Sequence, residues 1–264
     1  MKAFEIMDKL FGLAKHGDFS NTCDTCKAGD PNAEVDKVAV SMFATPDVIK
    51  NAKAWGAQLL IVHEPTYYNH MDTWSDEKIE TEKRKLIEES GLTLYRYHDH
   101  AHYTVPDVIA FGELKQLGLE GEIEYTDVFD LVRLRLREPL TPLALAEKIE
   151  KRLGISHVRI AGTRDAECSL ISLMFGAPGG VFGELKREES EIVLTGEACE
   201  WCICEYARDA AQLGHKKALI VMGHIGSERD GMKYTVDLLN EIYPELNVRY
   251  FECGEVYSYT DSRL

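Results

Sequence analysis

Short apolar segments alternate with amphipathic helix patterns along almost the whole chain, and this alternation constrains the fold more than any other feature. The segments rich in β-branched and aromatic residues predict strands; in the first half these are VDKVAVSM (35–42), QLLIVHEP (58–65) and LTLYRYHDH (92–100). Between them, Thr45 and Pro46 form a strong helix start, and that helix is expected to run to Gly56. Strands that alternate with helices predict an α/β fold with largely parallel sheets.

The alternation restarts after a polar stretch near residues 122–128, so we expect two α/β halves, 1–125 and 126–264. The segment 128–137 alternates apolar and charged residues with period two, which predicts a half-exposed strand. Further strands are expected at HVRIAGT (157–163), CSLISLMFG (168–176), EIVLTGE (191–197), KALIVMG (217–223) and NVRYFECG (247–254). Further helices are expected at 2–16, 76–90, from Pro106, at 142–154, at 198–214 and from Ser227 to about Tyr243.

The charge balance and the cysteine content exclude several classes of protein. The chain has 45 Asp and Glu against 30 Lys and Arg, and a net charge of −15 disfavours binding to a nucleic-acid polymer. No apolar run approaches the ~18 residues of a membrane span, and the N-terminus lacks the pattern of a secretory signal. Seven cysteines without regular disulfide spacing fit reduced thiols, so we expect a cytoplasmic protein.

Polar residues gather where four of the predicted strands end, which is where open α/β sheets bind ligands. These segments are His63-Glu64-Pro65, His98-Asp99-His100-Ala101-His102, Thr195-Gly196-Glu197 and Gly223-His224-Ile225-Gly226-Ser227-Glu228. Three of the four contain His, and two of those have a nearby carboxylate. Neutral imidazole and carboxylate together suit Zn, Mn, Fe, Co or Ni, so the sequence predicts a metal site.

The spacing within these segments suggests more than one ion. His63 and Glu64 are neighbours and would point to opposite faces of a regular strand, so two adjacent metals could each take one of them. His98 and His102 are four residues apart at a strand end and could converge on one cavity. Glu228 falls in a first helical turn, where the helix dipole favours a carboxylate that could bridge two ions.

These motifs resemble a known family. VAVSMFATPDVIKNAKAWGAQLLIVHEP, followed by YRYHDHAH, TGE and GHIGSE, is similar to the dinuclear metal-centre family of NGG-interacting-factor-three-like proteins, whose bacterial members are often called GTP cyclohydrolase 1 type 2 homologues. The resemblance runs from about residue 30 to residue 256, and GHxxSE is its most specific part. It implies two similar α/β subdomains, a hexameric ring, and a two-metal site in the cleft between the subdomains that faces an internal cavity.

The chain departs from the family pattern at two positions. The family usually has His-His-Pro where this chain has Glu64, and His-Thr-x-x-Asp where it has His102, so a His and a carboxylate are exchanged. An exchange keeps the ligand count and charge, which implies retained binding of two divalent transition-metal ions. On the resemblance, His63, Glu64, His102, His224 and Glu228 are the ligands, His98 is an acid–base group or additional ligand, and His100 and Glu197 are supporting or substrate-contacting residues.

Other features keep two interpretations each. Thr-Gly-Glu at Glu197 also serves simply as a helix entry, and the glycine-rich segment 176–180 is a tight turn or an anion site. Cys23 and Cys26 would form a structural zinc site only if they met the second cysteine cluster; free thiols are the default expectation. The second cluster comprises Cys199, Cys202 and Cys204, and the remaining His16, His70, His157 and His215 are expected to be ordinary packing or surface residues.

Three functions are compatible with these residues. The first is a dinuclear metal-dependent hydrolase acting on a small molecule such as a nucleotide, which the resemblance suggests. The second is a non-enzymatic protein that stores, delivers or senses metal or serves as an interaction scaffold. The third is a different hydrolase, of metallophosphoesterase or amidohydrolase type. Polar residues beyond the minimum ligand set (His98, His100 and Glu197) favour an enzyme, because a sensor needs no such surplus.

Overall fold

The computed structural model describes residues 1–126 and 131–260, and the chain divides into two compact units. Unit 1 comprises Met1–Ile109 together with the chain from Gly231 onward, and unit 2 is Ala110–Asp230. Two helices, α5 (Val108–Leu117) and α9 (His224–Ile242), contain the two division points.

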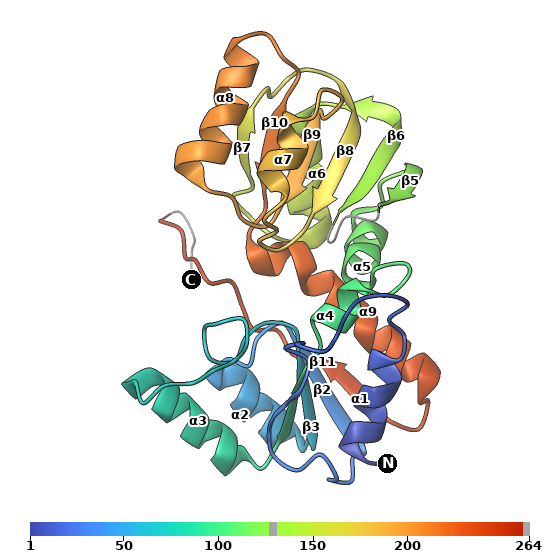
Figure 1. The fold of residues 1–264 in the computed structure, drawn as a ribbon, viewed down its shortest axis with the longest axis vertical. Coiled ribbons are helices and arrows are strands. Elements are labelled where there is room, and N and C mark those ends of the chain that lie inside the picture. The colour runs from blue at the N-terminus through green and yellow to red at the C-terminus, as the bar shows by residue number, and fades with distance from the viewer. Residues whose placement is uncertain (127–130, 261–264) are drawn as a thin grey trace. The chain divides into compact units, whose positions relative to one another are not determined.

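Unit 1 is built on a five-stranded sheet in the order β1-β4-β3-β2-β11 (Figure 1). Its central strands β3 and β4 are buried at every position; β3 is entirely apolar, as expected for a strand covered on both faces, whereas β4 carries the buried Arg96. β2, β3, β4 and β11 run parallel, and β1 pairs antiparallel with β4. The strands are β1 (Cys26–Ala28), β2 (Lys37–Ser41), β3 (Leu59–Val62), β4 (Thr93–Arg96) and β11 (Asn247–Tyr250).

Helices cover both faces of this sheet (Figure 1). The start of α2 is as expected: the Thr45 Oγ1 accepts a hydrogen bond from the Val48 N–H at 3.2 Å, and Gly56 ends the helix in the left-handed conformation. Val48 and Ile49 of α2 and Ile87 of α3 pack in one apolar cluster against the strands. The helices that lie wholly in unit 1 are α1 (Ala3–Phe11), α2 (Pro46–Trp55), α3 (Lys78–Ser90) and α4 (Asp99–His102).

Unit 2 contains a six-stranded mixed sheet in the order β5-β6-β8-β9-β10-β7. β8, β9 and β10 are parallel, β6 and β7 pair antiparallel with β8 and β10, and β5 pairs antiparallel with β6. The strands are β5 (Gly121–Tyr125), β6 (Val132–Leu140), β7 (Arg159–Gly162), β8 (Cys168–Met174), β9 (Ile192–Thr195) and β10 (Ala218–Val221). The helices are α6 (Pro142–Leu153), α7 (Val181–Lys186) and α8 (Glu205–Gln212), the last preceded by a π turn at Glu200–Cys204.

The α/β class and the two mixed sheets agree with the sequence-based prediction, but the units divide at different places. β11 pairs in parallel with β2, so the chain after Asp230 returns to the first sheet instead of staying with the second half. The first division falls at Ile109 and not near residue 125.

Several segment boundaries also differ. The strand expected at 92–100 ends at Arg96, because a short helix, α4, begins at Asp99. The first helix is shorter than 2–16 and ends at Phe11. The strand expected at 128–137 is seen from Val132, and its first residues lie outside the described part of the chain. β1 and β5 were not expected, because the first is very short and the second is exposed along its length.

Membrane insertion would require a long apolar helix, and none of the helices in the two described ranges meets that requirement.

Candidate metal centre

Three histidines of unit 1 meet at the carboxyl ends of β3 and β4. His63 follows β3 directly, His98 follows β4, and His102 ends α4. The ring centroids are 4.6 Å apart for His63 and His98, 5.1 Å for His63 and His102, and 5.0 Å for His98 and His102. One ring nitrogen of each histidine lies within 4.8 Å of the other two, so the three imidazoles can share one ion.

Each of these rings is oriented through its Nδ1 atom by an oxygen of the protein. An imidazole whose Nδ1 donates a proton presents the lone pair of Nε2, which is the form that binds a metal. The pairs are His63 Nδ1 with the Tyr97 carbonyl at 2.9 Å, His98 Nδ1 with Asp99 Oδ1 at 2.9 Å, and His102 Nδ1 with Asp107 Oδ2 at 3.1 Å. All three rings therefore leave the Nε2 lone pair available to a metal ion.

The Glu64 carboxylate completes this donor set. Its Oε1 lies 3.9 Å from His63 Nε2 and 4.0 Å from His98 Nε2. Donors around a tetrahedral ion at about 2.1 Å are roughly 3.4 Å apart, so this spacing needs only a small contraction around a metal. His63 and Glu64 do not diverge as in a regular strand, because both backbone N–H groups donate to the Met42 carbonyl where β3 ends.

Burial keeps His63 in the form that a metal requires. The side chain is completely inaccessible to solvent. This desolvation, together with the neighbouring His98, holds the pKa of His63 well below its ordinary value. His63 is therefore a neutral imidazole near pH 7.

His100 faces a different environment from the other histidines of its segment. Asp24 accepts hydrogen bonds from the backbone N–H of His98 at 2.6 Å and from the backbone N–H and Nδ1 of His100, both at 2.7 Å. The His100 ring stacks on Phe19 with centroids 3.7 Å apart. These contacts fix the first turn of α4, which carries His102.

A buried arginine, Arg96, supports the cluster through contacts with His63 and Glu64. Its Nε donates to the His63 carbonyl at 2.9 Å, and its guanidinium pairs with Glu64 at 3.8 Å and with Asp72 at 3.5 Å. Asp72 also pairs with Lys27 at 3.2 Å and accepts from the backbone of the loop that follows Glu64. Arg96, Asp24 and Asp107 were not predicted from the sequence, because isolated charged residues give no spacing signal.

Unit 2 holds the second predicted set of ligands. The His224 Nδ1 is 2.7 Å from Glu197 Oε1, and its Nε2 is 3.1 Å from Glu228 Oε2. His224 and Glu228 are one turn apart at the start of α9, and Glu228 is almost completely buried. Glu197 therefore contacts His224 directly and orients its ring.

The glycine-rich segment packs against this pair of residues. The Gly176 N–H donates to Ser227 Oγ at 2.9 Å, and that hydroxyl donates to the His224 carbonyl at 2.8 Å. Gly176 has a φ of +66°, and a Cβ there would collide with the Glu228 carboxylate. Its small size thus makes room for Glu228.

Replacing Gly176 by Ala is expected to destabilise unit 2 by about 1–3 kcal/mol, because the substitution adds backbone strain and displaces Glu228. Gly214→Ala is the matched control, since Gly214 has a φ of +88° but nothing within 4 Å of an added Cβ. Urea unfolding of both variants measures the difference. Equal losses of stability would show that Gly176 matters only for its backbone conformation.

The cysteines give no support to a structural zinc site built from the two cysteine clusters. All seven are free thiols, and Cys26 donates to the Ala28 carbonyl whereas Cys23 lies against Asp99. Within the described ranges, no candidate group of metal ligands contains two cysteines.

The fold and these clusters define an α/β protein of two units whose strand ends carry histidine and carboxylate donors. The family model described as Duf34/NIF3 (NGG1p interacting factor 3) matches residues 2–255, so the chain belongs to this family. The resemblance noted from the motifs is thereby confirmed.

Curated relatives align with most of the chain. A GTP cyclohydrolase 1 type 2 homolog of Yersinia pestis is 25% identical, with 83% of this chain and 85% of that protein covered. A homolog of the same name from Pyrococcus abyssi is 26% identical, over 79% of this chain and 81% of that protein.

Solved structures show the same fold at lower identity. The Bacillus cereus protein related to NIF3 superposes with a TM-score of 0.77 at 14% identity, covering 98% of this chain and 99% of that one. Reduced HcgD from Methanocaldococcus jannaschii gives a TM-score of 0.75 at 17% identity, covering 95% and 97%. The predicted fold class is therefore confirmed.

Proposed function

We propose that this NIF3-family protein is a metal-dependent hydrolase that acts on a small molecule such as a nucleotide. The observation that carries the proposal is the orientation of His63, His98 and His102, each held through Nδ1 by a protein oxygen, with the Glu64 carboxylate beside them. Purely structural histidines have no need for three such matched orientations around one point.

The proposed ligands are His63, Glu64 and His102 from unit 1 and His224 and Glu228 from unit 2. The contacts within each unit support metal binding by the ligands of that unit. The proposal that the five residues share two ions rests on the family resemblance. Imidazole and carboxylate suit Zn, Fe, Mn, Co or Ni. Two such ions, when bound, would lower the pKa of a coordinated water to about 7 and would polarise the substrate.

His98 is the proposed proton carrier. Its side chain is partly accessible, and its Nδ1 is fixed by Asp99. Although burial acts to raise it, the pKa of Asp99 lies far below its ordinary value, because His98 and Thr22 donate hydrogen bonds to the carboxylate. An ionised Asp99 holds the His98 ring in place for general acid–base transfer.

A nucleotide-type substrate is supported by the names of the relatives and by the local charge. Two divalent ions against the carboxylates of Glu64 and Glu228 would make the site positive, although the chain as a whole carries −15. We also propose the hexameric assembly that the resemblance implies, and a cytoplasmic location that fits seven free thiols.

A second candidate is a protein that binds metal without turnover, as a sensor, store or scaffold. This candidate is favoured because two of the additional polar residues, His100 and Glu197, make contacts within the protein and so have a structural role. His100 is held by Asp24 and Phe19, and Glu197 orients His224. Among the polar residues beyond the proposed ligands, His98 is then the one that supports an enzyme.

A hydrolase screen of the metal-loaded protein separates the two candidates. The substrates are GTP, cyclic nucleotides, phosphodiesters and amides, and His98→Ala is expected to lower kcat by about 10²–10⁴-fold while the metal stays bound. His16→Ala, a substitution of a surface histidine, should leave the rate unchanged. Inactivity of the loaded protein toward every substrate would replace the hydrolase proposal by the non-enzymatic one.

A further inference from the structure

A further set of metal-type donors lies in unit 1 and shares no ligand atom with the histidine cluster. It consists of Cys23, just before β1, His70, in the loop between β3 and α3, and Asp99, the first residue of α4. A sulfur, a ring nitrogen and a carboxylate oxygen from these three residues all lie within 4.8 Å of one another. We propose that Cys23, His70 and Asp99 bind an additional divalent cation of the borderline type that zinc represents.

The distances centre on one atom, Asp99 Oδ1. It is 3.5 Å from Cys23 Sγ and 3.9 Å from His70 Nε2. Donors around a tetrahedral zinc ion, with Zn–S about 2.3 Å and Zn–N about 2.0 Å, are roughly 3.4–3.6 Å apart. The cysteine and the aspartate already have that spacing, and the His70 ring is exposed and has room to move the short remaining distance.

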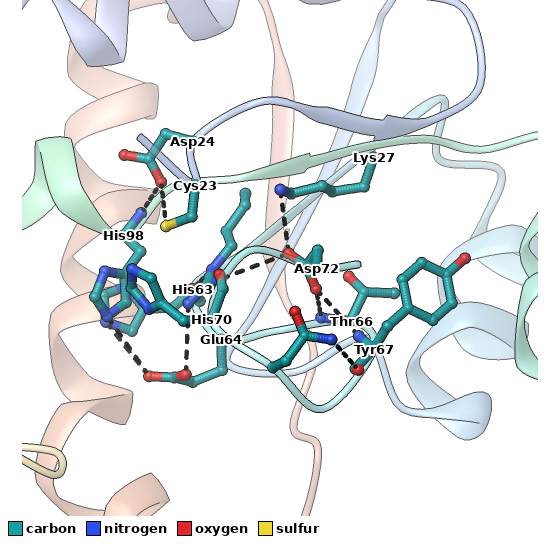
Figure 2. A network of polar contacts seen from close by, with 12 residues as sticks. Cys23, Asp24, Lys27, His63, Glu64, Thr66, Tyr67, His70, Asp72 and His98 are labelled. Atoms are coloured by element: carbon teal, nitrogen blue, oxygen red, sulfur yellow. Dashed lines mark hydrogen bonds and ion pairs between the residues drawn. The ribbon is translucent and has the colours of Figure 1, made fainter. Parts of the chain in front are cut away.

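The charges around Cys23 favour a cation. The side chain is almost completely buried, yet its sulfur lies 3.8 Å from a carboxylate oxygen of Asp24 (Figure 2) and 3.5 Å from one of Asp99. A bound divalent ion would displace the thiol proton and offset the carboxylates, as in other thiolate metal sites.

The loop that carries His70 is held in place by named contacts. Arg96 donates to the His70 carbonyl, and Asp72, with a φ of +57°, accepts from the backbone N–H groups of Thr66 and Tyr67. His70 therefore stays next to Asp99 although its ring is exposed. That exposure also gives an ion from solvent a path to the buried sulfur.

The donor set selects the class of ion. Thiolate with imidazole and carboxylate suits Zn²⁺, Co²⁺ or Cd²⁺ and disfavours the hard ions Mg²⁺ and Ca²⁺. Three protein donors leave one coordination position open, which is typical of exchangeable or reactive sites and not of closed structural ones. Because Asp99 Oδ1 also orients His98, an ion bound here would act on the histidine cluster through that carboxylate.

Cobalt binding to the full-length protein tests this site. The protein is stripped with a chelator, kept reduced and titrated with Co²⁺, and the thiolate-to-cobalt charge-transfer absorption in the near ultraviolet is recorded. We expect the band in the wild type and in Cys26→Ser, the matched control from the same C-x-x-C segment. It should be absent in Cys23→Ser, and His70→Ala should weaken the cobalt affinity read from it by about 10–100-fold.

Two results would overturn the proposal: a wild-type protein without the charge-transfer band, or a band that persists in Cys23→Ser. If Cys23→Ser does not fold by circular dichroism, the exposed His70 decides alone, and an unchanged affinity in His70→Ala rejects the site. Cobalt bound by nitrogen and oxygen ligands gives no thiolate band, and its visible absorption should depend on His63. The failure of this site is therefore distinguishable from failure of the proposed hydrolase centre.

Discussion

Replacing Arg96 by Leu is expected to lower the free energy of unfolding by about 3–5 kcal/mol, because removal of one partner leaves buried carboxylates without their counter-charge. Arg96 is completely buried and pairs with both Glu64 and Asp72, and it also donates to the His63 carbonyl. Urea unfolding followed by circular dichroism measures the change. Metal affinity should fall as well, because the backbone carbonyls of His63 and His70 both accept hydrogen bonds from Arg96 and would lose that donor.

The control for this prediction is Arg84→Leu in the same unit. Arg84 forms an exposed ion pair with Glu88 and lies over the Trp74 ring, so its removal should cost about 1 kcal/mol or less. If the two variants lost similar stability, Arg96 would not be the support of the cluster that its contacts indicate.

Substitution of Glu64 and His102 by Ala, singly and together, is expected to show strong coupling in metal affinity. Both residues lie against His63, and the sequence exchanges a His and a carboxylate at these two positions relative to the family pattern. If they share an ion, each single change should cost about 10–100-fold in affinity, and the second should add little to the first. Metal affinity is measured by competition with a chromophoric chelator.

A cycle of Glu64→Ala with His16→Ala supplies the reference for independence. His16 is an exposed residue of unit 1 that packs on Tyr103 and touches no member of the cluster. If the losses of metal affinity were additive for Glu64 and His102, as they should be for Glu64 and His16, the exchange interpretation would be refuted.

The parts of the fold that local chemistry determines were predictable from the sequence. The cap at Thr45, the stop at Gly56 and the buried strand β3 depend only on neighbouring residues. The pairing of β11 with β2 was not predictable, because it joins segments about two hundred residues apart and leaves no local pattern. The short helix α4 was missed for a related reason: it is stabilised by Asp24, a residue distant in the sequence.

The candidate site shows the same limit. His63, Glu64, His98 and His102 were identifiable, because each follows an apolar strand and the ends of adjacent parallel strands meet. The residues that orient them, such as Asp107 and Tyr97, depend on three-dimensional contacts alone. His70 was expected to be an ordinary surface residue, and only the folded loop places it beside Cys23 and Asp99.

Element analysis of protein purified without chelator tests the central claim most directly. The account predicts about two or more divalent transition-metal ions per chain in the wild type, and a loss of at least about one ion in His63→Ala. A wild-type protein without bound transition metal, or a His63→Ala variant with undiminished metal content, would contradict it.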